Sequence, residues 1–349
     1  MLFKKKRNKL EVFPDIIGLI ASKNPVSALE KTVKSLLEGG AKKVIVVNDG
    51  SDNEDSLNVF QTIKVIEGVE VVNLERNVGK ATALKEGFKR IPVGSVIAQT
   101  DDDTLAGNLK LPLEMILKGK AEIIDIRVET NHTKTLIGLI QELDYWMINA
   151  FIKRFQDLFR SRLWMSGASV MYTYRAGRVL LLEQAYTVTE DTEGMFRALS
   201  KGINMRFCSN KAAQFITMVP EDYRGLRKQW QRWAIGNGQV IGLYGLGGGL
   251  KRVSFMNALA WFLLTILPIP FIIINGLVSS LEWILIYSVI VGVLGAISLR
   301  RPAVILASPL LPVISVVWIL HAVEGIIRAL KKPISTGHLT WISPKRTTF

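Results

Sequence analysis

Two stretches decide the fold: residues 43–52 read KVIVVNDGSD, and residues 95–103 read SVIAQTDDD. Each starts as an apolar run of strand length and ends abruptly in acidic residues. Similar runs occur at residues 15–21 and 70–74, with helical patterns between the runs. Strands that alternate with helices predict an α/β domain, with a mostly parallel sheet that is covered by helices on both faces.

The intervening patterns contain start signals for two helices. Asn24-Pro25 is expected to provide the N-cap and the first-turn proline of a helix that runs to about Leu37. A second helix is expected at residues 80–89. Ligands of such sheets bind beyond the carboxyl ends of the strands, so the chemistry is expected there.

Acidic residues follow two of these strands. Asp49, taken alone, is explained by an ordinary Asp-Gly turn. Asp101, Asp102 and Asp103 differ, because three adjacent carboxylates repel one another unless a cation or solvent screens them. Their oxygens suit Mg²⁺ or Mn²⁺, and a solvated acidic turn is the alternative.

Two helix starts carry candidate binding groups. Lys80 follows Gly79 and occupies a first helical turn, which suits a phosphate or a sugar hydroxyl. Glu190 and Asp191 add carboxylates at another expected helix start. For one of these two acids, helix capping is the alternative role.

A third pattern combines three kinds of side chain on one helix. Gln229, Arg232 and Trp233 lie at i, i+3 and i+4, so they share one face. That face offers an amide, a fixed cation and an aromatic plane, which together can grip a diphosphate and stack on a sugar ring. The alternative is an amphipathic helix that lies against a membrane.

The composition narrows the class of partner. The 349 residues include 44 basic and 30 acidic side chains, which gives a formal net charge of +14. No zinc-finger spacing or RNA-binding signature accompanies this charge, so anionic lipids are the favoured partner and nucleic acid is not expected. Cys208 is the only cysteine and the three histidines are scattered, which argues against disulfides and zinc sites. The basic N-terminus lacks the apolar core of a signal peptide, so we expect a cytoplasmic catalytic part.

Apolar residues concentrate in the last third of the chain. Residues 255–278 and 282–299 are each long enough to cross a bilayer, and Ser279-Ser280 is the expected link of a helical hairpin. Basic pairs at positions 251–252 and 300–301 flank the hairpin and predict that both of its ends face the cytoplasm. We therefore expect an integral membrane protein.

The order of these motifs resembles the family-2 glycosyltransferases, and more narrowly the branch with hyaluronan, chitin, cellulose and poly-N-acetylglucosamine synthases. The resemblance implies a cytoplasmic GT-A domain at residues 1–250, which binds a nucleotide-sugar, and membrane helices at residues 251–330. The motifs that carry it are NDGSD at 48–52, NVGKATAL at 77–84, DDDT at 101–104, SGAS at 166–169, TED at 189–191 and QWQRW at 229–233.

The resemblance also implies roles for single residues on the donor side. Asp49 would contact the nucleotide, and Lys80 would help to bind the donor. Asp101 and Asp103 would form a DxD pair for Mg²⁺ or Mn²⁺, with Asp103 reaching the metal. Asp191 would be the general base.

Further roles concern the leaving group and the acceptor. Arg232 would steady the leaving diphosphate and Trp233 would stack near the acceptor, with Gln229 and Glu190 as additional substrate contacts. The implied reaction is a single displacement with inversion, which uses a UDP-sugar and gives a β-linked product. Such a transfer needs a base, a metal ion and a cationic side chain that stabilises the leaving diphosphate.

Two other segments fit the same resemblance. Residues 331–349 contain Trp341 and Lys345 in the sequence TWISPKR, which is similar to the segment that closes over the nucleotide. If this segment reaches a cytoplasmic site, the apolar run at residues 303–330 turns back or lies at the interface instead of crossing. Residues 136–159 resemble an interface helix beside the acceptor site.

The chain also departs from the family pattern. Asn48 stands where an aspartate is usual, and residues 22–25 replace a segment that usually ends in Asn-Glu, so base recognition is expected to differ. The N-terminal spans common in polymer synthases are missing. Two spans make a poor export channel, so secretion of a polymer would need self-association or a membrane partner.

Several functions stay open at this point. The leading hypothesis is a transferase that extends a β-linked polysaccharide, and its variant is a single transfer to a lipid acceptor. A non-catalytic glycan-binding or assembly subunit is a second class, against which the intact acidic motifs and Arg232 argue. A nucleic-acid-binding membrane protein is a third class, and it rests on charge alone.

Overall fold

The computed structural model of the chain describes residues 13–25, 27–158, 160, 164–183, 185–244 and 277–313, and residues 317, 320, 321, 323, 324 and 327. The expected first span up to residue 276 lies outside these described residues, as do Trp341 and Lys345 of the expected closing segment. The rest of the predicted catalytic domain can be followed almost continuously.

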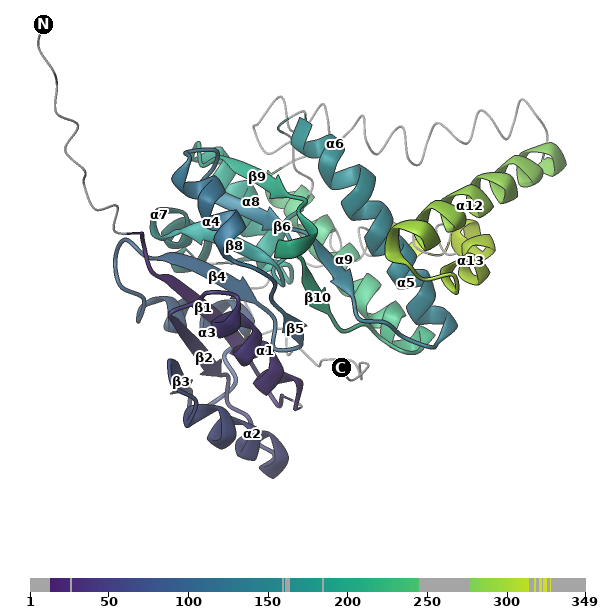
Figure 1. Cartoon of the computed structure of the whole chain (residues 1–349). Helices are drawn as coiled ribbons and strands as arrows, with labels where there is room; N and C mark the ends of the chain where they lie inside the picture. The colour runs from purple at the N-terminus through teal and green to yellow at the C-terminus, as the bar shows by residue number, and fades with distance from the viewer. Residues whose placement is uncertain are drawn as a thin grey trace, which may run out of the picture.

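A seven-stranded sheet forms the centre of the fold (Figure 1). The first four strands of its order are parallel, whereas β8 runs antiparallel to both of its neighbours. The expectation of an α/β fold with a mostly parallel sheet is therefore confirmed. In spatial order the strands are β3 (Val69–Asn73), β2 (Lys43–Asn48), β1 (Ile16–Ser22), β4 (Val96–Thr100), β8 (Val170–Thr173), β6 (Ile123–Ile126) and β9 (Met205–Cys208).

Helices bury both faces of this sheet. Val44 and Val46 of β2 pack on one face with α1, α2 and α4, while Ile45 and Val47 pack on the other face with α3 and α8. This alternation follows from the two-residue period of a strand, and it explains why β2 is apolar almost throughout. The helices are α1 (Ala28–Glu38), α2 (Glu54–Lys64), α3 (Lys80–Phe88), α4 (Lys110–Leu117), α7 (Tyr174–Gly177) and α8 (Glu190–Ser200).

The predicted start of the first helix is wrong. Helix α1 begins at Ala28, and Asn24 has a φ of 51° in the left-handed region. Asparagine tolerates this conformation, and here its side chain holds the turn after β2. Asn24 Nδ2 donates to Asp52 Oδ1 at 2.9 Å, and the Asp52 amide donates to Asn24 Oδ1 at 3.1 Å.

A small second sheet connects the acidic stretch at 101–103 with the following helices. Its order is β5 (Thr104–Leu105), β10 (Phe215–Thr217) and β7 (Val128–Thr130). After β7 the chain forms a continuous helical segment. It consists of α5 (Leu136–Met147), a π-helical stretch (Ile148–Ile152) and α6 (Lys153–Leu158). These bounds match the helix expected at residues 136–159, apart from the π-helical stretch.

The C-terminal part of the structure packs on α5. In Figure 1, α12 (Leu277–Leu299) and α13 (Val304–Ala307) lie beside α5, on the far side of it from the sheet. Within the described residues, one helix is long and apolar enough to cross a membrane, with a mean hydropathy of 2.0 over Glu282–Leu299. Ser279 and Ser280 lie inside α12, so the expectation that they link two spans is wrong: both serines continue the helix. A 3₁₀ turn (Ser308–Leu310) interrupts the next apolar run at Pro309.

Candidate active site

Lys80 lies between acidic residues of two of the motifs that the sequence singled out. It opens α3, directly after Gly79, whose φ of 86° suits glycine. Lys80 Nζ is 2.5 Å from Asp101 Oδ1 and 3.4 Å from Glu190 Oε1. The end of β4 and the start of α8 are thus joined through a single ammonium group.

The charge of Lys80 is stabilised by its neighbours. Burial alone would lower its pKa, but the carboxylates of Asp101, Glu190 and Asp191 outweigh that effect and raise the pKa. Lys80 is therefore a permanent cation at neutral pH. A diphosphate that entered the site would meet this cation within a cluster of acids, so a divalent metal would be needed to balance the remaining negative charge.

Asp49 holds the loop that presents Lys80. Its side chain is only 4% exposed, and its carboxylate accepts hydrogen bonds from the amides of Val78 at 2.7 Å and Gly79 at 3.0 Å. The sequence suggested a nucleotide contact for Asp49 and did not indicate this internal role. The NDGSD turn and the start of α3 are therefore one structural unit.

The three consecutive aspartates are not equivalent. Ser22 Oγ donates to Asp102 Oδ2 at 2.5 Å, so the middle carboxylate is fastened to the end of β1. Asp101 instead contacts Lys80, and Asp103 is 6% exposed and accepts a hydrogen bond from Thr104 Oγ1 at 3.3 Å.

The carboxylates of the site could hold a divalent metal only together with oxygens from a substrate. Among the described residues, no group of three or more His, Cys, Asp or Glu side chains could hold a metal ion. Asp101 and Asp103 offer hard carboxylate oxygens, and Mg²⁺ commonly takes one or two protein carboxylates together with substrate phosphates. These two aspartates would hold Mg²⁺ or Mn²⁺ once a diphosphate supplied further oxygens.

Asp191 has the environment of a general base. Its Oδ2 accepts from the Gly167 amide at 2.9 Å, and its Oδ1 accepts from the Thr192 amide at 2.7 Å. Burial, followed by the charge of Glu190, raises the pKa of Asp191 to about 6, against the lowering effect of Lys80. A carboxylate with this pKa is mostly ionised at pH 7 and is still basic enough to take a proton.

A buried acid that the sequence did not single out fixes the start of α8. Glu193 is fully buried and accepts hydrogen bonds from the amides of Tyr186 at 2.7 Å and Thr187 at 2.9 Å. Arg197 Nη1 donates to the other oxygen of Glu193 at 3.1 Å. This network holds the loop before the TED motif, and its i, i+4 spacing within α8 is the signal that could have revealed it.

Helix α9 (Tyr223–Tyr244) packs closely against the TED motif. A Cβ on Gly236 would lie 2.3 Å from Thr189 Oγ1, and the Val188 amide donates to Gln239 Oε1 at 2.9 Å. The glycine therefore allows α9 to approach the start of α8. This contact places the helix that carries the QWQRW motif beside Asp191.

The three α9 residues share one helix, as expected. Gln229 is 6% exposed, while Arg232 and Trp233 are half-buried. The charges of Arg232 and Asp101 both act on the phenol of Tyr145, a residue of α5. Tyr145 was missed by the sequence analysis, because it reads as part of an amphipathic helix.

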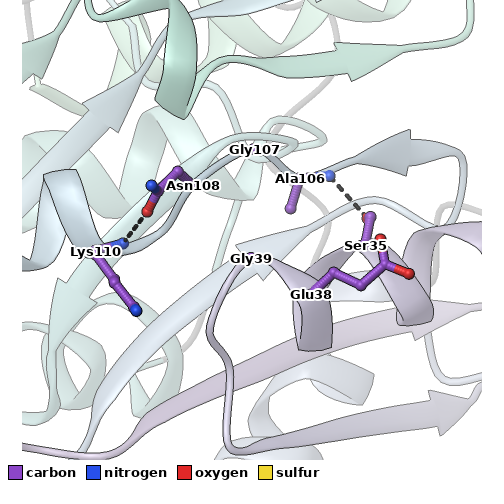
Figure 2. A pocket seen from close by; sticks show the side chains of 7 residues that line it. All are labelled: Ser35, Glu38, Gly39, Ala106, Gly107, Asn108 and Lys110. Carbon is purple, nitrogen blue, oxygen red and sulfur yellow. Dashed lines mark hydrogen bonds between the residues drawn. The ribbon is translucent and has the colours of Figure 1, made fainter.

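A surface hollow of the described structure lies away from these residues (Figure 2). It has a volume of about 300 Å³ and is formed by the C-terminal end of α1 and the loop after β5. Its polar groups bond to one another, since the Ala106 amide donates to Ser35 Oγ and the Lys110 amide donates to Asn108 Oδ1, both at 2.9 Å. Lys80, Asp101, Glu190 and Asp191 are called the acid cluster below. Because α1 begins at the carboxyl edge of the sheet and runs away from it, the hollow is separate from this cluster.

Comparison with known families gives two overlapping matches. Residues 101–318 match the family described as "Glycosyl transferase family group 2". Residues 19–175 match "Glycosyl transferase family 2". Together the two matches cover the seven strands of the main sheet except the first residues of β1, and every described residue of the acid cluster.

Individual relatives are more distant. The poly-β-1,6-N-acetyl-D-glucosamine synthase of Staphylococcus aureus is 26% identical over 246 residues, which are 69% of this chain and 58% of that protein. The synthase of the same name from Staphylococcus epidermidis is 27% identical over 247 residues, with the same coverage. The chain thus matches somewhat more than half the length of these curated relatives.

A solved structure shares the fold. The mannosyltransferase PcManGT from Pyrobaculum calidifontis, solved in complex with GDP-Man and Mn²⁺, superposes with a TM-score of 0.56. The alignment covers 84% of this chain and 86% of the mannosyltransferase, at 13% sequence identity. At this identity the likeness establishes a common architecture and leaves the substrate open.

Proposed function

The chain belongs to glycosyl transferase family group 2, and from this premise we propose that it is a membrane-bound, inverting transferase. It moves a sugar from a UDP-sugar to a growing β-linked polysaccharide. The observation that carries this proposal is the placement of Lys80 between Asp101 and Glu190, next to a base of raised pKa at Asp191. Such an arrangement combines a phosphate-binding cation, metal-binding acids and a proton acceptor.

Each residue of the proposed active site has a separate role in a single displacement reaction. Asp191 takes the proton of an acceptor hydroxyl as the oxygen attacks the anomeric carbon. The bond from that carbon to the diphosphate oxygen breaks on the opposite face, which inverts the configuration. Lys80 and Arg232 hold the departing nucleoside diphosphate by charge-assisted hydrogen bonds. A divalent metal held by Asp101 and Asp103 supplies positive charge to the diphosphate when it is bound.

The surface of α12 supports a membrane location. Trp283 and Tyr287 are each 60% exposed and Ile297 is 71% exposed, although all three are large apolar or aromatic residues. Such a row on a 23-residue helix suits lipid better than water. Phe151 and Leu158, in the segment that follows α5, are 53% and 76% exposed, which supports the proposal that this segment lies at the membrane interface.

The catalytic domain and α12 are joined by a polar contact. Arg301 follows α12, and its Nη2 donates to Glu142 Oε1 at 3.1 Å and to the Thr133 carbonyl at 2.6 Å. Because Glu142 belongs to α5, the active-site domain is held close to the membrane helix. With the net charge of +14, this arrangement favours a cytoplasmic domain against anionic lipid.

The names of the relatives suggest the first donor and acceptor to test. Two of them are poly-β-1,6-N-acetyl-D-glucosamine synthases, so UDP-N-acetylglucosamine is the leading donor and a β-linked chain of that sugar is the leading acceptor. The solved mannosyltransferase was in complex with GDP-Man, so GDP-sugars should be tested as donors as well. A lipid acceptor is the second candidate, because α12 holds the site next to the bilayer.

The test is the release of nucleoside diphosphate by the protein in membranes. A panel of UDP- and GDP-sugars is supplied with Mn²⁺, with Mg²⁺ or with a chelator, and the Asp191→Asn variant serves as the control. Metal-dependent release from one donor, lost in the variant, supports the proposal. Turnover with no donor, even after a lipid extract and a glycan acceptor are added, would favour the non-catalytic subunit.

A further inference from the structure

Helix α5 carries two polar side chains that are half-buried and lack partners in the described structure. The carboxylate of Asp144 and the hydroxyl of Tyr145 make no hydrogen bond or ion pair with any described residue. A carboxylate that is partly removed from water without a partner costs free energy. Because neither side chain is fully buried, water or a bound ligand can supply these hydrogen bonds.

The packing of α5 brings Tyr145, with Asp144 next to it in the chain, within reach of the charges of Asp101 and Arg232. Gln141 Nε2 donates to the Pro220 carbonyl at 2.9 Å. Two residues earlier, the Met218 amide donates to the Asp103 carbonyl at 3.2 Å, so the strand end next to α5 also holds the acidic stretch. Asp144 and Tyr145 lie three and four residues after Gln141, on the same side of the helix.

The chain after this pair is also unusual. Ile148–Ile152 form a π-helical stretch, and Asn149 Nδ2 donates to the carbonyls of Tyr145 and Val128, both at 2.6 Å. π-Helical turns are rare and occur frequently at functional sites, where they change the direction of nearby side chains. The stretch therefore sets the orientation of the last turn of α5 against β7.

The surrounding charges fix the protonation of the two groups. Burial and the charges of Asp144 and Asp101 raise the pKa of Tyr145, against the effect of Arg232, so its phenol stays a hydrogen-bond donor. Burial raises the pKa of Asp144 to about 6, so at pH 7.5 this carboxylate is ionised and accepts hydrogen bonds. The pair thus presents an acceptor and a donor side by side.

We propose that Asp144 and Tyr145 bind the ring hydroxyls of a sugar at the active site and contribute to sugar specificity. This inference rests on the proposed transferase function. Vicinal hydroxyls both donate and accept, which matches a carboxylate next to a phenol. The same chemistry is offered by the sugar of the donor and by the terminal sugar of the acceptor, so the two sources must be separated by experiment.

The test uses variants that keep the shape of each side chain. Asp144→Asn and Tyr145→Phe are compared with Glu114→Gln on α4 and Tyr223→Phe at the start of α9, two exposed positions that receive the same chemical change. In membranes, KM is measured separately for UDP-N-acetylglucosamine and for a β-1,6-linked N-acetylglucosamine trimer. Binding of each probe to the purified full chain is also measured by calorimetry.

We expect KM or Kd for one of the two probes to rise about 10-fold or more in both α5 variants, and to stay unchanged in both controls. The affected probe identifies the sugar. Unchanged KM and Kd for both probes would overturn the assignment while leaving the transferase function in place. A wild-type chain without turnover would count against the transferase function, and the calorimetry would still decide on Asp144 and Tyr145.

Discussion

The amide of Gly167 donates a hydrogen bond to the carboxylate of Asp191, with 2.9 Å between Gly167 N and Asp191 Oδ2. A Cβ built on Gly167 would lie 2.9 Å from that same oxygen. The hydrogen bond and the small size of the glycine are therefore linked. The SGAS motif acts on the TED motif by leaving room for the carboxylate of Asp191, the proposed base, and by orienting it.

Replacing this glycine should harm catalysis more than binding. In Gly167→Ala the new methyl group displaces the Asp191 carboxylate, and small displacements of a catalytic group can cost on the order of 10²-fold in rate. We expect kcat to fall by that order while KM for the donor changes little. Gly242→Ala in α9 is the matched control, since a Cβ there meets nothing within 4 Å. A normal kcat in Gly167→Ala would contradict this account.

The pH profile should report Asp191. The base must be ionised to work, so kcat/KM should rise with pH through about 6 and level off above it. Asp191→Asn should lose on the order of 10²-fold or more. In Glu190→Gln a neighbouring negative charge is removed, which lowers the pKa of Asp191 and moves the acid limb to lower pH. An unmoved limb would show that Glu190 does not influence the base.

Lys80 should affect both donor binding and the base. Its ammonium group lowers the pKa of Asp191, so Lys80→Met should move the acid limb to higher pH, opposite to Glu190→Gln. Loss of a charge-assisted contact to phosphate should also raise KM for the donor by about 10-fold or more. Steady-state kinetics across pH measure both effects. Lys89→Met, at the exposed end of α3, should show neither of them.

The metal requirement should separate two adjacent aspartates. Asp103→Asn removes an expected metal ligand, so the Mn²⁺ concentration for half-maximal activity should rise by at least about 10- to 100-fold, the usual effect of losing an outer-shell partner. Asp102 is instead bonded to Ser22, so Asp102→Asn should keep the metal dependence of the wild type. Metal titration of nucleotide release measures both variants. Equal shifts in the two would remove the distinction.

A buried ion pair should govern the stability of α6. Lys153 and Asp125 are 2% and 1% exposed, and Lys153 Nζ is 3.0 Å from Asp125 Oδ2. Lys153→Met leaves a buried carboxylate without its cation, which should cost about 3–5 kcal/mol in the free energy of unfolding. The double variant Lys153→Met/Asp125→Leu should recover much of that loss. Urea unfolding of the solubilised protein measures the free energy of unfolding of each variant. If Lys153→Met were as stable as the wild type, the ion pair would not contribute to stability.

Sequence patterns located most elements of the catalytic domain. The strand predicted at KVIVVN has the bounds Lys43–Asn48, because its buried β-branched run ends at a sharp turn. The start of α1 was missed, because the Asn24 side chain pairs with Asp52, and its local sequence reads equally well as a cap. The link at Ser279-Ser280 was also wrong, because serine continues a helix when the flanking residues are strongly apolar.

The sequence by itself determined which chemical groups are available and near which strand or helix end each one stands. Apolar periodicity is local, so it could place Asp101 after a strand, and Lys80 and Asp191 near helix starts. Only the tertiary structure decided that Lys80 contacts Asp101 and Glu190, that Gly167 donates to Asp191, and that the charges of Asp101 and Arg232 reach Tyr145. These contacts depend on the order of strands in the sheet and on the docking of α5 and α9. Neither is encoded in a short window of residues, because both arise from packing between distant segments.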